Sequence, residues 1–252
     1  MALPSIDPWA IAVLFMAIAL GSLAKGVTGI GLPILAIPLI AAFMGVEHGV
    51  VVMALPALVS NLWLVLAYRR YARRDSRLVV FLIAGTFGGV LGTWFLAEAS
   101  AAALSLTLAG WLAVYLVLLV RRTEIRLPDS LLVSPVAGMA SGVIQGATGI
   151  SAPLIAPYLQ ALGLTREAFV FAIALAFSLF GIAQIAAILH NGLLTPDRAA
   201  HSLLALLPVV LFLPLGMRLG RHGGERVFRP VFIGALVLLE LRLLQQGLMP
   251  PA

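Results

Sequence analysis

The stretch KGVTGIGLP, residues 25–33, is nearly repeated as QGATGISAP at residues 145–153. The two stretches pair position by position at an offset of 120 residues, from 25 to 145, and share the pattern G-x-T-G-I-x-x-P. Each stretch interrupts a strongly apolar region, so the chain contains two matched breaks inside two matched hydrophobic halves. This arrangement is typical of transporters whose binding site lies between two repeats.

The composition requires a bilayer around the chain. Of its 252 residues, 62% are hydrophobic and only 10% are charged, whereas a soluble domain carries about 25% charged residues. We therefore expect an all-α, polytopic membrane protein of a bacterial-type cell (inner) membrane. The net charge of +6 comes from loop arginines that follow the positive-inside rule, so it does not indicate a nucleic acid partner. The absence of cysteine excludes disulfides and thiolate metal sites.

Apolar segments recur in the same order in both halves. The first half has segments at residues 9–24, 32–44, 49–67, 78–97 and 101–120, and the second has them at 131–144, 152–162, 168–189, 199–215 and 231–244. Further residues match between the halves: Glu47 with Glu167, and Leu91-Gly92 with Leu215-Gly216. The sequence thus predicts one membrane domain (1–252) made of repeat 1 (9–122) and repeat 2 (130–248).

The two repeats are predicted to be inverted. The first two segments of each half are shorter than the roughly 20 residues of a full span. They form either a re-entrant hairpin or two tilted short crossings, and both arrangements return the chain to its starting side. Three ordinary spans follow, so each half crosses the membrane an odd number of times. Both termini are then expected to be extracytoplasmic.

The arginines favour this topology. With the loop at 69–77 in the cytoplasm, the inverted arrangement also places the arginines of 121–126, Arg166 and those of 218–229 inside. Only Arg198 and Arg242 fall outside, and Lys25 lies within the membrane. If each hairpin were a single span, Arg166 and the arginines of 218–229 would move outside, against the positive-inside rule.

At these residues the chain resembles the TauE/SafE family of membrane transporters, which is associated with export of sulfite and small organosulfur anions. The paired G-x-T-G-[IV]-x-x-P breaks, the apolar repeats and the length carry the resemblance, which spans residues 9–248. The resemblance implies transport of a small anion, and it does not single out sulfite.

The two breaks are predicted to build an anion site. Pro33 and Pro153 suit the first turn of a new helix, so half-helices are expected to begin near Ile30 and Ile150. Helix starts offer N–H groups and about half a positive charge each. The candidate substrate-binding residues at the breaks are Lys25, Gly26, Thr28, Gly29, Gln145, Gly146, Thr148, Gly149 and Ser151.

Lys25 is the only lysine of the chain and suggests an anionic ligand. A charge within a membrane segment is costly and usually functional. The alternative is that Lys25 ends a full span and its amine reaches the cytoplasmic interface. Its repeat partner, Gln145, is neutral.

Several other polar residues have two interpretations. Thr28 and Thr148 either cap the half-helices or donate to the ligand. The break glycines Gly26, Gly29, Gly146 and Gly149 allow turns and close backbone approach, whereas Gly85, Gly88, Gly89 and Gly92 suit helix packing. Asn61 and Gln184 interrupt apolar segments and either line the pathway or join helices.

The leading hypothesis is a secondary transporter, an exporter of small anions of the sulfite or organosulfonate type, and not an enzyme. Proton or sodium is the expected coupling ion, but no acidic residue lies in the middle of a segment to carry a proton. Glu240 and Arg242 are expected to meet an interface. No metal-ligand spacing or nucleotide-binding motif occurs, so no cofactor is expected. The alternatives are an anion channel and an intramembrane enzyme; the sequence specifies no oligomeric state.

Overall fold

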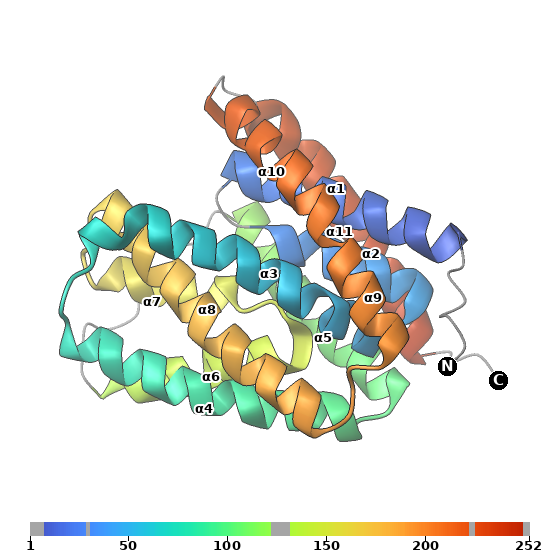
Figure 1. The fold of residues 1–252 in the computed structure, drawn as a ribbon, viewed down its shortest axis with the longest axis horizontal. Helices are drawn as coiled ribbons and strands as arrows, with labels where there is room; N and C mark the ends of the chain where they lie inside the picture. The colour runs from blue at the N-terminus through green and yellow to red at the C-terminus, as the bar shows by residue number, and fades with distance from the viewer. Residues whose placement is uncertain (1–7, 29–30, 122–131, 222–224, 249–252) are drawn as a thin grey trace. The chain divides into compact units, whose positions relative to one another are not determined.

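The computed structural model describes residues 8–28, 31–121, 132–221 and 225–248, and all regular elements in this part of the chain are helices (Figure 1). The first half forms α1 (Pro8–Thr28), α2 (Leu32–Met44), α3 (Val46–Tyr68), the short 3-10 helix η1 (Arg69–Tyr71), α4 (Ser76–Glu98) and α5 (Ala101–Arg121). The second half forms α6 (Val133–Thr148), α7 (Ala152–Ala161), α8 (Arg166–His190), α9 (Pro196–Leu204), α10 (Leu206–Arg221) and α11 (Glu225–Leu248).

The prediction of an α-helical, multi-pass membrane protein is confirmed. Within the described residues, six helical stretches are long and apolar enough to cross a membrane. They correspond to α1, α3 with η1, α4, α5, α8, and α9 with α10. The helix α2 is apolar but shorter than these.

The helices before the two breaks are longer than the sequence suggested. α1 and α6 continue to Thr28 and Thr148, so Lys25 and Gln145 lie in last turns and not in irregular backbone. A single glycine costs a helix only about 1 kcal/mol, and buried packing compensates for that cost. The following helices begin at Leu32 and Ala152, as the apolar segments predicted, and two residues after Ile30 and Ile150.

The predicted segment 199–215 is divided into two helices. α9 ends at Leu204 and α10 begins at Leu206, with Ala205 between them. Pro208 explains the division, because proline has no N–H to donate to the carbonyl four residues earlier, at Leu204.

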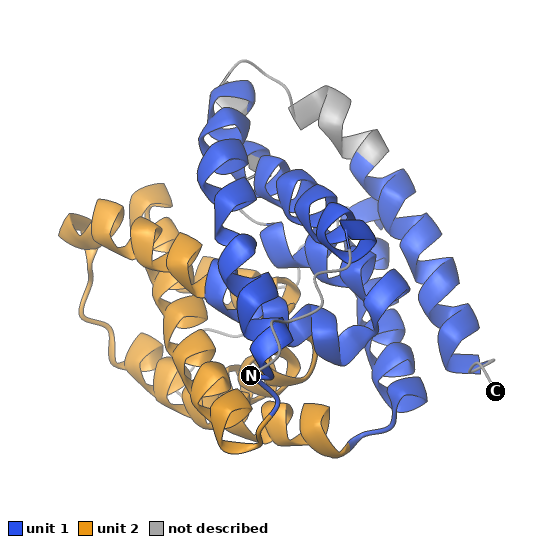
Figure 2. Cartoon of the chain, turned by 45° about the vertical axis from the view of Figure 1, so that its right-hand side comes forward, with its two compact units in different colours: residues 1–56, 99–121, 193–252 blue, residues 57–98, 122–192 orange. Residues whose placement is uncertain are grey.

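The chain forms two compact units that do not coincide with the two sequence halves (Figure 2). Unit 1 contains Met1–Pro56, Ala99–Arg121 and Leu193–Ala252, and unit 2 contains Ala57–Glu98 and Arg122–Gly192. Unit 1 therefore joins α1 and α2 to α10 and α11, whereas unit 2 joins α4 to α6, α7 and α8. Each unit combines helices from both halves of the sequence.

In unit 2, glycines let α4 and α6 approach closely. A β-carbon on Gly88 or Gly92 of α4 would collide with the backbone carbonyls of Met139 or Val143 on α6. A β-carbon on Gly85 would collide with the ring of Phe180. These contacts confirm that the α4 glycines serve helix packing.

In unit 1, α1 and α10 pack through residues that match, in the sequence repeat, those that join α6 and α4 in unit 2. A β-carbon on Gly216 would lie 2.5 Å from the carbonyl oxygen of Leu23, and Leu23 matches Val143 at the offset of 120. Gly216 in turn matches Gly92 at the offset of 124. The sequence repeat thus reappears as a repeated helix contact, with α1 on α10 in one unit and α6 on α4 in the other.

The same contacts confirm one of the two roles expected for the break glycines Gly26 and Gly146, namely close backbone approach. A β-carbon on Gly26 would lie 2.6 Å from the Cα of Gly216, and one on Gly146 would lie 2.6 Å from the nitrogen of Thr93. Both glycines are helical. They are required by close helix packing and not by a turn.

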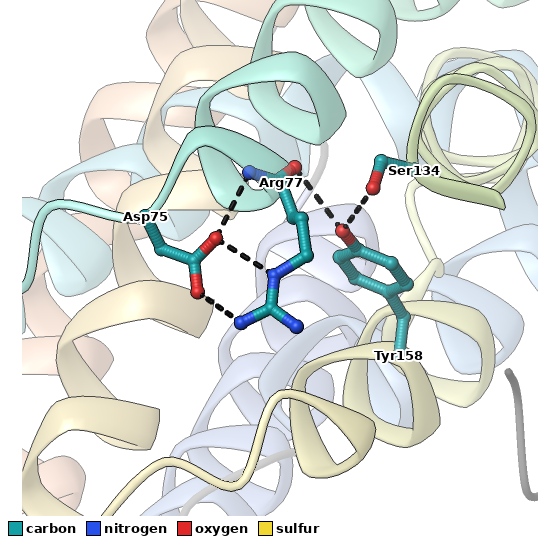
Figure 3. Close-up of polar contacts among 4 residues, drawn as sticks. All are labelled: Asp75, Arg77, Ser134 and Tyr158. Atoms are coloured by element: carbon teal, nitrogen blue, oxygen red, sulfur yellow. Dashed lines mark hydrogen bonds and ion pairs between the residues drawn. The ribbon is translucent and has the colours of Figure 1, made fainter. Parts of the chain in front are cut away.

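Each break joins two helices that fold back on one another. In unit 1, the ring of Trp9 near the start of α1 meets Phe43 near the end of α2, edge to face, with centroids 6.3 Å apart. In unit 2, the Tyr158 hydroxyl of α7 donates to Ser134 Oγ near the start of α6, at 2.8 Å (Figure 3). The two helices of each hairpin therefore run in opposite directions.

Tyr158 also ties the α6–α7 hairpin to the start of α4. Its hydroxyl lies 3.1 Å from the carbonyl oxygen of Arg77 (Figure 3), and its ring stacks on Phe81 with centroids 4.3 Å apart. Asp75 caps α4 by accepting from the Arg77 backbone N–H at 2.9 Å. The Arg77 guanidinium bonds the same carboxylate and lowers the pKa of Asp75.

Replacing Tyr158 with phenylalanine isolates the contribution of this hydroxyl. The ring stack on Phe81 is retained, whereas Ser134 Oγ loses a buried hydrogen bond. We expect a loss of about 1 kcal/mol in stability, measured as a lower midpoint of thermal unfolding in detergent. Changing the exposed Ser76 to alanine serves as the matched control, and an unchanged midpoint for Tyr158→Phe would contradict the assignment.

Candidate functional site

The second break is a sharp turn that follows the end of α6, and its first residue, Gly149, has a left-handed backbone conformation. Gly149 has a φ of 71°, a conformation that favours glycine, and its N–H bonds the carbonyl of Gln145 at 2.7 Å. The Thr148 hydroxyl donates to the carbonyl of Ile144 at 2.8 Å and accepts from the Ile150 N–H at 3.2 Å. Thr148 therefore stabilises the turn between the helices and does not cap α7.

Three buried polar side chains meet at this break. Ser151 Oγ donates to Gln145 Oε1 at 2.6 Å. From α8, Gln184 Nε2 donates to the carbonyl oxygens of Gln145 at 3.1 Å and Gly146 at 3.3 Å. Gln184 is 2% exposed and Gln145 is 5% exposed. The structure thus brings four sequence-predicted residues together: Gln145, Thr148, Ser151 and Gln184.

These bonds satisfy the backbone that the break leaves unpaired. An unsatisfied polar group in hydrocarbon costs several kcal/mol, and Gln184 supplies donors to the carbonyl end of α6. Among the described residues, Gln145 Nε2 has no acceptor. The side-chain amide of Gln145 is therefore a donor at the break that no protein acceptor uses in this part of the chain.

The helices that follow the two breaks start without a side-chain cap. Neither Gly31 before α2 nor Ser151 before α7 accepts a capping hydrogen bond from its helix, and each helix has a proline in its first turn. By contrast, Thr165 caps α8 by accepting from Ala168 N–H, and Thr195 caps α9 by accepting from Arg198 N–H. The two break helices thus differ from α8 and α9 in how their N-termini are completed.

The first break belongs to unit 1. Lys25 lies in the last turn of α1 and is only 6% exposed. The negative end of the helix dipole favours a cation at this position. Gly31 has a φ of 151°, and its carbonyl accepts from Leu35 N–H at 3.2 Å at the start of α2. Among the other predicted residues here, Gly29, Ile30 and the Thr28 side chain lie outside the described residues.

Asn61 lies on the part of α3 that belongs to unit 2. Its side chain is 6% exposed, and the neighbouring Ser60 donates its hydroxyl to the carbonyl of Ala57 on the same helix. Gln184, the other predicted pathway residue, bonds the carbonyl end of α6 directly.

The geometry of two hairpins, each broken at G-x-T-G-I-x-x-P, agrees with a comparison against protein families. The family model described as sulfite exporter TauE/SafE matches residues 13–243. The chain belongs to the sulfite exporter TauE/SafE family. Neither curated proteins nor solved structures gave a match in the corresponding comparisons. Membership makes this chain a multi-pass membrane transporter with a small anion as substrate.

The resemblance inferred from the two breaks is thereby confirmed for the sulfite exporter TauE/SafE family. The match begins within α1 and ends within α11, so it includes both breaks and both units.

Sequence reasoning missed two contacts in unit 1 between α9 and the start of α3. Arg198 Nη1 pairs with Glu47 Oε1 at 2.6 Å, and His201 Nδ1 lies 3.2 Å from His48 Nε2. The residues are about 150 positions apart, and no sequence pattern linked them. Within the described residues, no group of three or more His, Asp or Glu is placed to hold a metal ion.

The interface prediction is wrong for Glu240. Its side chain on α11 is 8% exposed, and its Oε2 has no hydrogen-bond partner among the described residues. Arg242, two residues later, is exposed; it donates through Nε to the carbonyl of Ala42 at 2.7 Å and covers the ring of Phe43.

Proposed function

We propose that this protein is a secondary transporter that exports small anions of the sulfite or organosulfonate type. The observation that carries the proposal is the pair of breaks followed by helices without side-chain caps, in a member of an anion exporter family. Uncapped helix N-termini attract anions through their N–H groups and their dipole. A tetrahedral or pyramidal sulfur oxyanion has several oxygens to accept such bonds.

We assign each break residue a role in this proposal. The N-termini of α2 and α7 donate backbone N–H groups, and Gln145 Nε2 adds a side-chain donor beside Ser151. Thr148 and Gly149 hold the turn, and Gln184 fixes the end of α6. Lys25 supplies the positive charge that balances the anion. Gly26 and Gly146 set the helices against their neighbours.

The burial of Lys25 supports its role as an anion contact. A lysine that snorkels holds its charged group in water, whereas Lys25 is 6% exposed. A buried charge requires compensation. We propose that an anion provides part of that compensation, in addition to the carbonyl end of α1 and the protein groups that contact Lys25.

We further propose that the repeats are inverted and alternate in opening the site to the two sides of the membrane. The arginine distribution supports this topology, as do the two hairpins, in each of which the second helix runs back along the first. Both termini are extracytoplasmic in this topology. Transport is coupled to a proton or a sodium ion.

The proposed substrate class is tested by thermal stabilisation of the purified protein. Sulfite, sulfate, methanesulfonate and acetate are compared with chloride at equal ionic strength. A ligand at 100 times its Kd stabilises the protein by about 2.7 kcal/mol, so we expect a clear rise in unfolding midpoint with sulfite or methanesulfonate. Stabilisation by none of the sulfur oxyanions would overturn the proposal.

Exchange in proteoliposomes separates a transporter from a channel. A transporter accelerates uptake of labelled sulfite when unlabelled sulfite is present on the other side, because alternating access couples the two fluxes. A channel carries sulfite current without this acceleration. We expect accelerated exchange, and its absence together with sulfite conductance would favour the channel.

A further inference from the structure

The least expected side chain in unit 1 is a carboxylate within its packed interior. Glu240 is the sixteenth residue of the 24-residue helix α11 and lies eight residues before its end, about 12 Å along the axis. Its side chain is 8% exposed, and within the described residues Oε2 is buried without a hydrogen-bond partner. The adjacent buried residues of α11 are Leu236, Leu239 and Leu243.

The helices packed on α11 provide no partner for this carboxylate. α11 contacts α2, α5 and, less extensively, α1. α2 has no ionisable side chain, the ionisable residues of α5 are Tyr115 and Arg121, and that of α1 is Lys25. Among the described residues, no ion pair joins any of them to Glu240.

The other charged residues of α11 either bond to other groups or lie far from Glu240 along the helix. Arg242 donates to the carbonyl of Ala42, where Gln246 also donates at 2.9 Å, and its guanidinium covers Phe43. Arg229 precedes Glu240 by 11 residues, about 16 Å along a helix, and Glu225 and Arg226 precede it by more. Glu240 is thus set among apolar side chains, with the nearest arginine of its helix directed to α2.

An ionised carboxylate is strongly disfavoured in such surroundings, and the neutral acid is the form that fits them. We propose that Glu240 is the proton-binding site of this transporter, loaded in the conformation seen here and deprotonated when the site meets water during the cycle. The step is a proton transfer between water and one carboxylate oxygen, with no other bond made or broken. The inference rests on the proposed function and identifies its coupling ion as a proton.

The first test does not depend on transport. The infrared spectrum of the purified protein at pH 7 is compared for wild type and Glu240→Gln. We expect wild type to show a C=O stretching band of a protonated carboxylic acid that Glu240→Gln lacks. The control is Glu98→Gln, the same substitution at an exposed acid at the end of α4, which should retain the band. An identical carboxylic acid band in wild type and Glu240→Gln would overturn the proposal.

The second test measures proton and anion fluxes together. Proteoliposomes with a sulfite gradient and an internal pH dye report protein-dependent acidification or alkalinisation, and sulfite is assayed separately. We expect Glu240→Gln to lose at least nine-tenths of the sulfite-dependent proton flux of wild type while it still exchanges sulfite for sulfite. Glu240→Asp, which keeps a titratable acid, should restore part of the proton flux and shows whether the position tolerates change.

The outcomes separate this inference from the proposed function. Sulfite exchange with an unchanged proton flux in Glu240→Gln would refute the proton site and leave the transporter assignment intact. If wild type exchanges none of the sulfur oxyanions, the proposed function fails, and the infrared comparison still decides whether Glu240 holds a proton.

Discussion

Lys25→Gln is expected to reduce anion transport by about ten- to a hundredfold while the amount of protein in the membrane stays unchanged. A hydrogen bond to a charged group contributes about 1.5–3 kcal/mol, and 1.4 kcal/mol corresponds to a factor of ten. Lys25 is buried, so its charge is weakly screened. The measurement is sulfite exchange in proteoliposomes, normalised to the amount of reconstituted protein.

The matched control for Lys25 is a cation outside the breaks. Arg73 lies in the exposed loop between η1 and α4, and Arg73→Gln removes the same unit of charge. We expect Arg73→Gln to exchange sulfite at the wild-type rate. Equal exchange by Lys25→Gln and wild type would instead assign Lys25 to the interface or to the end of α1.

Gly146→Ala is expected to produce a large loss of stability for a change of a single methyl group. Its β-carbon would lie 2.6 Å from the nitrogen of Thr93 and still closer to the carbonyl oxygen of Gly89, and both are backbone atoms of α4. Overpacking of this kind costs about 1–3 kcal/mol, and each kcal/mol lowers the unfolding midpoint by roughly 2–4 °C for a chain of this size.

Two further alanine variants show whether the loss comes from the helix contact. Gly26→Ala in α1 meets the backbone of Gly216 in the same manner, so its unfolding midpoint should fall by a similar amount. Gly110 in α5 has no atom within 4 Å of the position of a β-carbon, and Gly110→Ala should be neutral or slightly stabilising. A midpoint for Gly146→Ala equal to that of Gly110→Ala would contradict the packing role.

The sequence predicted the helical segments well because the bilayer imposes one simple rule. Nearly every apolar run became a helix, since a lipid-exposed backbone must satisfy its own hydrogen bonds. The ends were less accurate at α1 and α6, because the G-x-T-G motif predicts irregular backbone from its first residue, whereas both helices continue to the motif threonine. The local sequence could not predict that the first residues of the motif are helical. Close helix packing offsets the cost of placing Gly26 and Gly146 in a helix, and no local pattern reveals that packing.

The candidate site was predicted in part. Gln145, Thr148, Ser151 and Gln184 meet at one break because three belong to the motif itself and Gln184 is a rare polar residue in an apolar segment. Glu240 was misjudged because its distance from the end of the segment suggested an interface, whereas its burial depends on which face α11 turns to α5 and α2. Sequence periodicity in a helix that is apolar on most sides does not specify that face.

The contact between α1 and α10 has a consequence for biogenesis. α1 ends at Thr28 and its partner begins at Leu206, so a ribosome that adds about 5–20 residues per second needs roughly 10–35 s to supply the partner. α4, by contrast, is synthesised before α6, and every helix of unit 2 is complete by Gly192. Unit 2 can therefore assemble in the membrane before α10 is synthesised. Until then, the glycine face of α1 contacts lipid or the insertion machinery.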